Sequence, residues 1–169
     1  GCIPTKALLE HAHALKVIQA AAEWGVTMPP GAPAIDLRQV QARKDKVVSG
    51  LTRGIEYLFK KNKIDWIKGT ARLAGGGHVD VDGGQAIQGS EIVIATGSTP
   101  RGVPGIDIDR TRIVTSDEAI HLADLPRSLV ILGSGAVGVE FASIFRRFGS
   151  DVTIVELLGR LVPVEDEAI

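Results

Sequence analysis

The chain has 169 residues, of which 44% are hydrophobic and 23% charged, and its formal net charge is -1. This is an ordinary globular composition, with enough residues to bury a core. A charge so close to neutral gives no basic field for nucleic acid or an anionic membrane, and no apolar run approaches the roughly 20 residues that cross a bilayer. We therefore expect neither nucleic acid nor a membrane as a partner.

The single cysteine, Cys2, has no partner for an internal disulfide. The four histidines follow no metal-ligand spacing, so we expect no metal site. The chain begins with Gly1 rather than Met and stops soon after the acidic turn at 165–167. We expect both ends to be cuts in a longer protein.

Two helices are predicted in the first part of the chain. Apolar residues recur at three- and four-residue steps from Pro4 to about Trp24, and Gly25 provides a helix end. Asp36 begins a capping-box pattern, and the helix that it opens is predicted to end in the lysine cluster 60–63, where cations suit the helix dipole.

The period then changes to that of strands. Four short segments, 64–68, 71–74, 78–82 and 85–88, are separated by glycine-rich turns, which indicates a β-meander. The continuous apolar run 91–95 predicts a strand buried on both faces. The Pro- and Gly-rich stretch 100–105 is the best candidate for a linker.

The second half has the pattern of an α/β fold. Ser116 is predicted to cap a short helix. Leu129–Leu132 and Asp151–Glu156 are predicted to be buried strands, with a glycine turn and a helix between them from Gly133 to Phe148. A strand, a helix and a strand at this spacing are typical of a βαβ unit with parallel strands.

The sequence Gly133-Ser134-Gly135-Ala136-Val137-Gly138 matches GxGxxG, directly after a predicted strand and at the start of a predicted helix. Gly133 would form the tight turn, Gly135 would let a pyrophosphate approach the backbone, and Gly138 would let helix and strand pack closely. Glu156 ends the next strand, 23 positions after Gly133. A carboxylate there accepts hydrogen bonds from a ribose 2′-hydroxyl and repels a 2′-phosphate, so the pattern predicts an NAD site. The alternative is a glycine-rich turn without a ligand, and Arg160 is expected on the surface rather than against a 2′-phosphate.

The first residues, Gly1-Cys2-Ile3-Pro4-Thr5-Lys6, place a thiol at the start of the first predicted helix, where the dipole favours a thiolate. Lys6 lies one turn further along the same face. Without further context, a lone cysteine is more often an inert part of a core.

GCIPTKALLE resembles the second half of the redox-active motif of the pyridine nucleotide-disulfide oxidoreductases. IVIATGS and ILGSGAVGVEFASIF are similar to two further segments of that family, so the resemblance covers essentially the whole chain. It implies an α/β fold with two Rossmann-like dinucleotide-binding domains, each incomplete here. Residues 1–111 would belong to an FAD-binding domain that includes the β-meander, and residues 112–169 would begin an NAD-binding domain.

The resemblance also implies roles for individual residues. Cys2 would be the flavin-proximal member of a cysteine pair whose other member precedes this chain, and Lys6 would lie near the flavin, paired with Glu140. The predicted catalytic residues are Cys2, Lys6 and Glu140. The predicted contacts with FAD and NAD are Lys6, Gly69, Thr96, Gly97, Ser98, Gly133, Gly135, Ala136, Val137, Gly138, Glu140 and Glu156.

Within the family, three features favour members that oxidise dihydrolipoamide with NAD. The CIPTK motif lacks a second lysine, Glu156 indicates NAD, and ELLGRLVP is similar to the corresponding stretch of such enzymes. The implied partners are the lipoyl domain of a 2-oxoacid dehydrogenase or glycine cleavage complex and a second copy in a homodimer, in the cytoplasm. The family's catalytic His–Glu pair would lie outside this chain.

Three alternatives to this function remain open. The protein could be a mercuric or glutathione-type reductase, a flavin transhydrogenase, or a dinucleotide-binding module without catalysis. The 169-residue chain alone is expected to be inactive, to bind FAD poorly and to aggregate.

Overall fold

The computed structural model describes residues 1–166 and 168, and it divides into two compact units. The first unit comprises Gly1–Leu51 together with Gly102–Ile169, and the second comprises Thr52–Arg101. The mixed α/β architecture predicted from the sequence is confirmed. The predicted domain boundary at 111/112 concerns the longer protein and stays a prediction.

The first predicted helix is present. Helix α1 spans Cys2–Gln19, and a 3-10 helix, η1, follows at Ala21–Trp24. Gly25 ends η1 in the left-handed region, with φ 71°, as the sequence predicted. The helix begins at Cys2, ahead of Pro4, because both the N–H and the hydroxyl of Thr5 donate to the Gly1 carbonyl, at 3.2 and 2.8 Å. That pair of bonds closes the first turn around the cysteine.

Helix α2 spans Leu37–Lys61. The Asp36 carboxylate accepts the Gln39 N–H at 3.2 Å, which is half of the predicted capping box. Lys60 and Lys61 lie in the last turn, as predicted. Only Val40 and Lys44 of this helix are buried.

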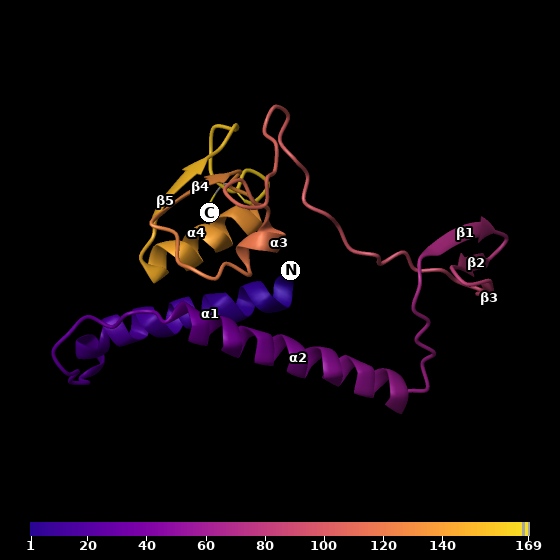
Figure 1. Cartoon of the computed structure of the whole chain (residues 1–169), viewed down its shortest axis with the longest axis horizontal. Helices are drawn as coiled ribbons and strands as arrows, with labels where there is room; N and C mark the ends of the chain where they lie inside the picture. Colours follow the sequence, from indigo (N-terminus) through magenta and orange to yellow (C-terminus); the bar gives the residue numbers. More distant parts are fainter. Residues whose placement is uncertain (167, 169) are drawn as a thin grey trace. The chain divides into compact units, whose positions relative to one another are not determined.

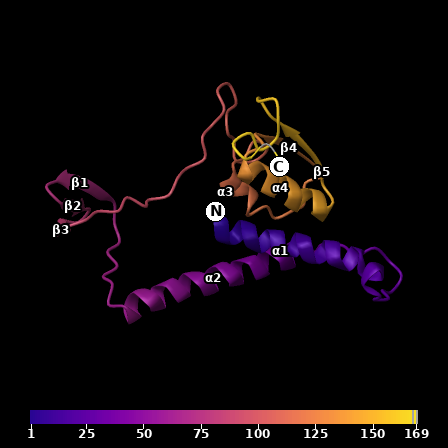
Figure 2. The ribbon, with the colours of Figure 1, turned by 180° about the vertical axis from the view of Figure 1, so that it is seen from behind.

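The core of the first unit is built by helices. Helix α4, Ala136–Phe148, lies alongside α1 (Figures 1 and 2). The rings of Phe141 and Phe145 stack with centroids 6.2 Å apart. The remaining buried members of this cluster come from α1, the start of α2, the short helix α3 at Ser116–Ala119 with the residue after it, and α4: Leu8, Ala12, Val40, Ala119, Ile120, Ile144 and Phe148.

Strands β4, Ser128–Leu132, and β5, Asp151–Val155, pair in parallel, as the βαβ pattern predicted. Their side chains alternate, so Leu129 and Ile131 pack against the helical core while Val130 is 62% exposed. The prediction that these strands are buried on both faces is therefore wrong for this structure. A parallel sheet is covered twice only when helices lie on both faces, and among the described residues only one face is covered.

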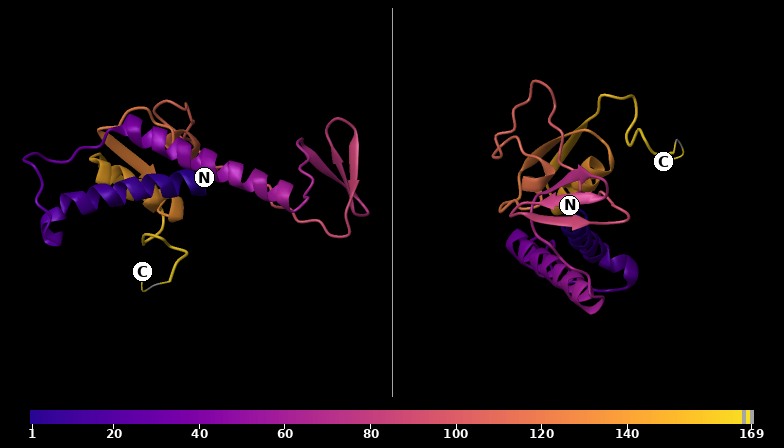
Figure 3. Two further views of the ribbon diagram at one scale, coloured as in Figure 1. Left: turned by 90° about the horizontal axis from the view of Figure 1, so that it is seen from below. Right: turned by 90° about the vertical axis from the view of Figure 1, so that its right-hand side faces the viewer.

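The second unit contains an antiparallel meander of β1, Ala71–Gly75, β2, His78–Val81, and β3, Gln85–Gln88 (Figure 3). These three strands confirm three of the four predicted segments. Residues 64–68 and 91–95 are not strands, and Val93 is 86% exposed. Both predictions fail because a strand needs a neighbour to complete its hydrogen-bond ladder, and no described strand pairs with either segment.

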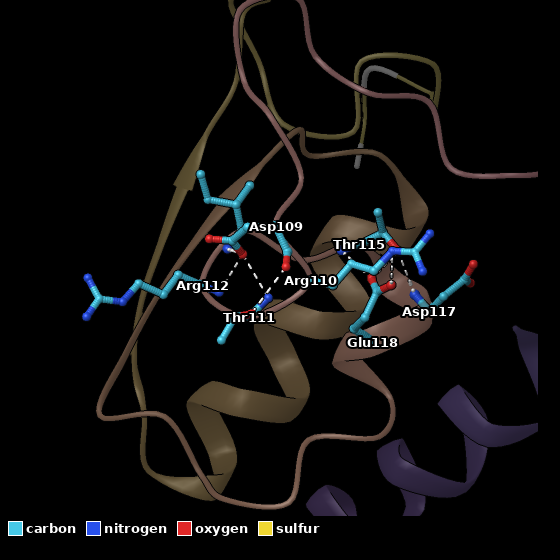
Figure 4. Close-up of polar contacts among 8 residues, drawn as sticks. Asp109, Arg110, Thr111, Arg112, Thr115, Asp117 and Glu118 are labelled. Atoms are coloured by element: carbon cyan, nitrogen blue, oxygen red, sulfur yellow. Dashed lines mark hydrogen bonds and ion pairs between the residues drawn. The ribbon is translucent and has the colours of Figure 1, made fainter.

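Helix α3 is capped by Thr115 and not, as predicted, by Ser116 (Figure 4). The Thr115 hydroxyl accepts the Asp117 N–H at 3.2 Å and donates to Glu118 at 2.7 Å, and Glu118 accepts the Thr115 N–H at 2.8 Å. Thr115 has the extended backbone that an N-cap requires, whereas Ser116 is already helical. The hydroxyl and N–H of Thr115 hold the pKa of Glu118 below its usual value.

The loop before α3 is organised by Asp109. One of its carboxylate oxygens accepts the N–H groups of Ile113, Thr111 and Arg112, at 2.8, 2.7 and 2.7 Å (Figure 4). These bonds lower the pKa of Asp109, and the bond from the Ile113 N–H contributes most.

None of the helices in the described part of the chain is both long and apolar enough to span a bilayer.

Candidate dinucleotide site and redox motif

The glycine turn joins the carboxyl end of β4 to α4. Gly133 has φ 98°, in the left-handed region that disfavours side chains, and its N–H donates to the Val155 carbonyl at 2.8 Å. The turn therefore lies against the end of β5. This is the strand–turn–helix context that a dinucleotide fingerprint needs.

Gly138 is required by the packing of helix on strand. A Cβ placed there would lie 2.1 Å from the Gly133 carbonyl oxygen and 3.4 Å from Cγ2 of Ile131. No side chain fits at the first of these distances, because the neighbour is backbone. Glycine at this position therefore serves the fold itself.

Gly135 differs, because the fold does not require it to be glycine. Its φ is -66°, which any residue adopts, and a Cβ there would meet nothing within 4 Å. It is the N-cap of α4, and the N–H groups of Ala136 and Val137 that follow have no intrahelical acceptors. The open backbone at this helix start fits an incoming pyrophosphate, which a side chain at 135 would obstruct.

Glu156 lies beside the same turn. Its Oε2 accepts both the N–H and the hydroxyl of Ser134, each at 2.7 Å, and its Oε1 accepts the Leu158 N–H at 3.0 Å. These bonds lower the pKa of Glu156 to about 2, the Leu158 N–H contributing most and the Ser134 hydroxyl next. The carboxylate is thus ionised at neutral pH and held at the edge of the predicted NAD site.

Sequence reasoning missed Ser134 and Leu158 as parts of this site. Ser134 occupies a variable position of GxGxxG, and Leu158 lies in the loop after the strand. No motif signals either residue. Only the approach of the turn to the end of β5 reveals their contacts with Glu156.

Arg160 is exposed, as expected. Its Nη2 donates to the carbonyls of Pro163, at 3.1 Å, and Glu165. The guanidinium therefore organises its own loop.

The redox motif lies on α1, against α4. Cys2 is an exposed free thiol in the first helical turn. The Lys6 ammonium forms an ion pair with the Glu140 carboxylate of α4, and their side chains are 60% and 29% exposed. This contact joins two motifs 134 residues apart. The redox roles of Cys2, Lys6 and Glu140 stay predictions.

Four of the predicted FAD contacts, Gly69, Thr96, Gly97 and Ser98, belong to the second unit. A Cβ at Gly69 would lie 2.5 Å from a side-chain carbon of Val81, and Gly97 has φ 83°. The local structure of the chain therefore explains why both positions are glycine, without a ligand. Thr96 and Ser98 are exposed and lie outside helices and strands. These observations do not test FAD binding, which stays a prediction at these positions.

Within residues 1–166 and 168, no three His, Cys, Asp or Glu side chains gather as metal ligands would. The structure gathers the predicted site residues of its first unit, apart from Cys2, into two places. One is the glycine turn with Glu156, and the other is the contact of Lys6 with Glu140.

Comparison with known proteins agrees with these features. The profile of the family described as "Pyridine nucleotide-disulphide oxidoreductase" matches residues 1–169. Dihydrolipoyl dehydrogenase 3 of Pseudomonas putida is 47% identical over 175 residues, covering 98% of this chain and 36% of the relative. Dihydrolipoyl dehydrogenase of Bacillus subtilis (strain 168) is 44% identical over 172 residues, covering 100% of this chain and 38% of the relative.

A solved structure gives a similar result. The Cu(II) complex of the HOCl-induced flavoprotein disulfide reductase RclA from Escherichia coli superposes with a TM-score of 0.76 at 34% identity, covering 100% of this chain and 35% of that chain. The chain spans about a third of the length of the relatives it matches. With its full length matched by the family profile, the chain belongs to the pyridine nucleotide-disulphide oxidoreductase family.

Proposed function

We propose that the protein containing this chain is an FAD- and NAD-dependent disulfide oxidoreductase that oxidises dihydrolipoamide. The observation that carries the proposal is the ion pair between Lys6, in the cysteine motif, and Glu140, in the helix of the dinucleotide fingerprint. It brings a thiol motif and a nicotinamide-dinucleotide motif onto adjoining helices. The dihydrolipoyl dehydrogenases at 44 and 47% identity support the choice of substrate.

Cys2 is the flavin-proximal thiol of the reactive cysteine pair, and it is released when the disulfide is reduced. Dihydrolipoamide is oxidised by thiol–disulfide exchange with the disulfide between Cys2 and a cysteine that precedes this chain, and the protein's cysteines are reduced. Cys2 lies exposed in the first turn of α1. Bound FAD would supply the two-electron carrier between this thiol and the nicotinamide.

Lys6 and Glu140 set the charge around that thiol. Lys6 lies one helical turn beyond Cys2 on α1, so its ammonium places a positive charge on the same face of the helix. Glu140 fixes the direction of the lysine side chain through their ion pair. The NAD pyrophosphate is held at the start of α4 around Gly135, and its adenosine ribose by Glu156. The FAD contacts are Gly69, Thr96, Gly97 and Ser98.

The same proposal covers the partners. The reduced lipoyl group is delivered on the lipoyl domain of a 2-oxoacid dehydrogenase or glycine cleavage complex. The enzyme is a cytoplasmic homodimer, with an NAD-binding domain that begins near residue 112. Its acid–base pair lies outside the present chain.

The test uses the full-length protein loaded with FAD. Dihydrolipoamide and NAD are supplied, and formation of NADH is followed by absorbance. We expect turnover in the wild type and none in Cys2→Ser, which should still pass electrons from NADH to an artificial acceptor through the flavin. Lack of NAD reduction by the wild type with dihydrolipoamide would contradict the proposal.

A second candidate is a disulfide reductase that runs from a reduced nicotinamide toward a different acceptor. The similarity to the flavoprotein disulfide reductase RclA favours it. In the same assay this enzyme would consume NADH with another disulfide or oxidant and would not oxidise dihydrolipoamide.

A further inference from the structure

Ser134 is enclosed within the glycine turn, with every polar group engaged. The residue is 0% exposed. Its N–H and its hydroxyl both donate to Oε2 of Glu156 at 2.7 Å, and its carbonyl accepts the Val162 N–H at 3.1 Å. The side chain is therefore fixed and points at the carboxylate.

The carboxylate of Glu156 has little capacity left. An ionised carboxylate offers about four acceptor positions, two on each oxygen. Ser134 fills the two on Oε2, and the Leu158 N–H fills one on Oε1. Oε1, which accepts only the Leu158 N–H among the hydrogen bonds described above, is the oxygen better able to accept a donor from outside the chain.

We propose that Ser134 is a positioning residue for cofactor choice, which holds Glu156 so that its Oε1 takes a ribose hydroxyl and its charge excludes a 2′-phosphate. The inference rests on the proposed function, because it assumes that NAD binds at this turn. It assigns a role in cofactor choice to a position at which the GxGxxG motif allows any residue. Two donors on one oxygen stop the carboxylate from rotating about its last bond, and they favour its charged form.

The chain offers a matched control in Ser150. This serine is also 0% exposed, and its hydroxyl donates to the Pro126 carbonyl at 2.6 Å. It lies just before β5, whereas Glu156 follows that strand. Ser150→Ala thus removes a buried serine hydroxyl without touching the carboxylate.

The experiment uses the full-length, FAD-loaded enzyme in five forms: wild type, Ser134→Ala, Glu156→Gln, the double variant and Ser150→Ala. For each, kcat/KM is measured with NAD and with NADP, and the ratio of the two is the readout. We expect Ser134→Ala to lower the ratio about tenfold, mainly through a higher KM for NAD. In the Glu156→Gln background the serine substitution should change the ratio no further, and Ser150→Ala should leave it at the wild-type value.

A second readout is the pH dependence of NAD binding. Removing the Ser134 hydroxyl raises the pKa of Glu156 toward its usual value, so NAD binding should be lost at a higher pH in Ser134→Ala. Should that variant fail to accumulate, Ser134→Cys keeps an unbranched side chain with a much weaker donor and gives the same comparison.

The possible results distinguish a failure of the proposed role of Ser134 from a failure of the proposed NAD-dependent function. A wild type that prefers NAD, with an unchanged ratio in Ser134→Ala, overturns the inference alone. So does an equal fall of the ratio in the Glu156→Gln background or in Ser150→Ala. A wild type that does not use NAD overturns the proposed function and the inference together.

Discussion

At the scale of single residues, two glycines of the fingerprint, Gly138 and Gly135, are glycine for different physical reasons. A Cβ at 138 would meet the Gly133 carbonyl at 2.1 Å, whereas a Cβ at 135 would meet nothing within 4 Å. Gly138 is thus required by the packing of helix on strand. Gly135 is not required by packing, so its lack of a side chain can serve a ligand.

Gly138→Ala should therefore destabilise the protein, by roughly 3 kcal/mol, because helix and strand must separate. Gly135→Ala should leave stability unchanged or slightly higher, yet weaken NAD binding by at least about tenfold. Thermal melts and NAD titrations check the pair. Equal loss of stability in both variants would contradict the distinction.

Glu156 also makes stability depend on pH. Its pKa falls from 4.5 to about 2 on folding, so the unfolded chain binds the proton more tightly. The stabilisation is therefore fully present above about pH 4.5 and is lost as pH falls toward 2. We expect the wild type to exceed Glu156→Gln in Tm at pH 7, and the difference to shrink below pH 4.5. A difference in Tm that stayed constant across this range would show that the charge is not responsible.

At the scale of elements, a buried lysine links α2 to the end of α3. Lys44 is 1% exposed, and its ammonium contacts three polar groups. They are the Ile120 carbonyl at 3.0 Å, Nδ1 of His121 at 3.1 Å and the Asp45 carboxylate at 3.1 Å. The buried ammonium is thus held by polar groups of α2 and of the two residues that follow α3.

Lys44→Met should destabilise the docking of these helices by about 1 to 3 kcal/mol, because the buried Ile120 carbonyl loses its partner. Urea unfolding measures the loss. Lys46→Met, at an exposed lysine of the same helix, is the matched control and should be close to neutral. Similar losses of stability in the two variants would mean that the buried contacts of Lys44 do not stabilise the protein.

The start of α3 depends on the Thr115 hydroxyl, which both accepts from Asp117 and donates to Glu118. Thr115→Ala should cost about 1 kcal/mol of stability, as for other N-caps, whereas Thr115→Ser keeps the hydroxyl and should retain most of it. Hydrogen exchange across α3, together with the melting temperature, tests this prediction. Equal protection in the alanine and serine variants would rule out the cap as the cause.

At the scale of the whole chain, apolar segments that the sequence predicts as inner strands are exposed. Val93 and Ile94 are 86 and 70% exposed, and Val130 of β4 is 62% exposed. Surfaces of this kind promote association, and unpaired strand edges add to it. We expect the 169-residue chain alone to bind a hydrophobic dye and to aggregate, and the full-length protein to do neither. A monodisperse 169-residue chain that bound FAD would contradict this expectation.

Local signals in the sequence determined much of the fold. Apolar periodicity predicted α1, α2 and α4, and glycine spacing predicted the meander and the parallel βαβ unit. The glycine fingerprint and Glu156 were found in the same way, because each needs only a fixed spacing along the chain. The redox motif came from a resemblance of contiguous residues, which is also local information.

Which groups far apart in the sequence come into contact depends on how the helices and strands pack. The clamp of Ser134 on Glu156 and the burial of Lys44 depend on contacts between residues 22 and 76 positions apart, which no local pattern encodes. The choice of Thr115 over Ser116 as cap depended on backbone angles that either residue type permits. Residues 64–68 and 91–95 have strand-like sequences but form no strand here, because a ladder requires a neighbour and composition cannot supply one. The sequence thus determined the parts and their chemistry, and the packing of distant segments decided which parts act together.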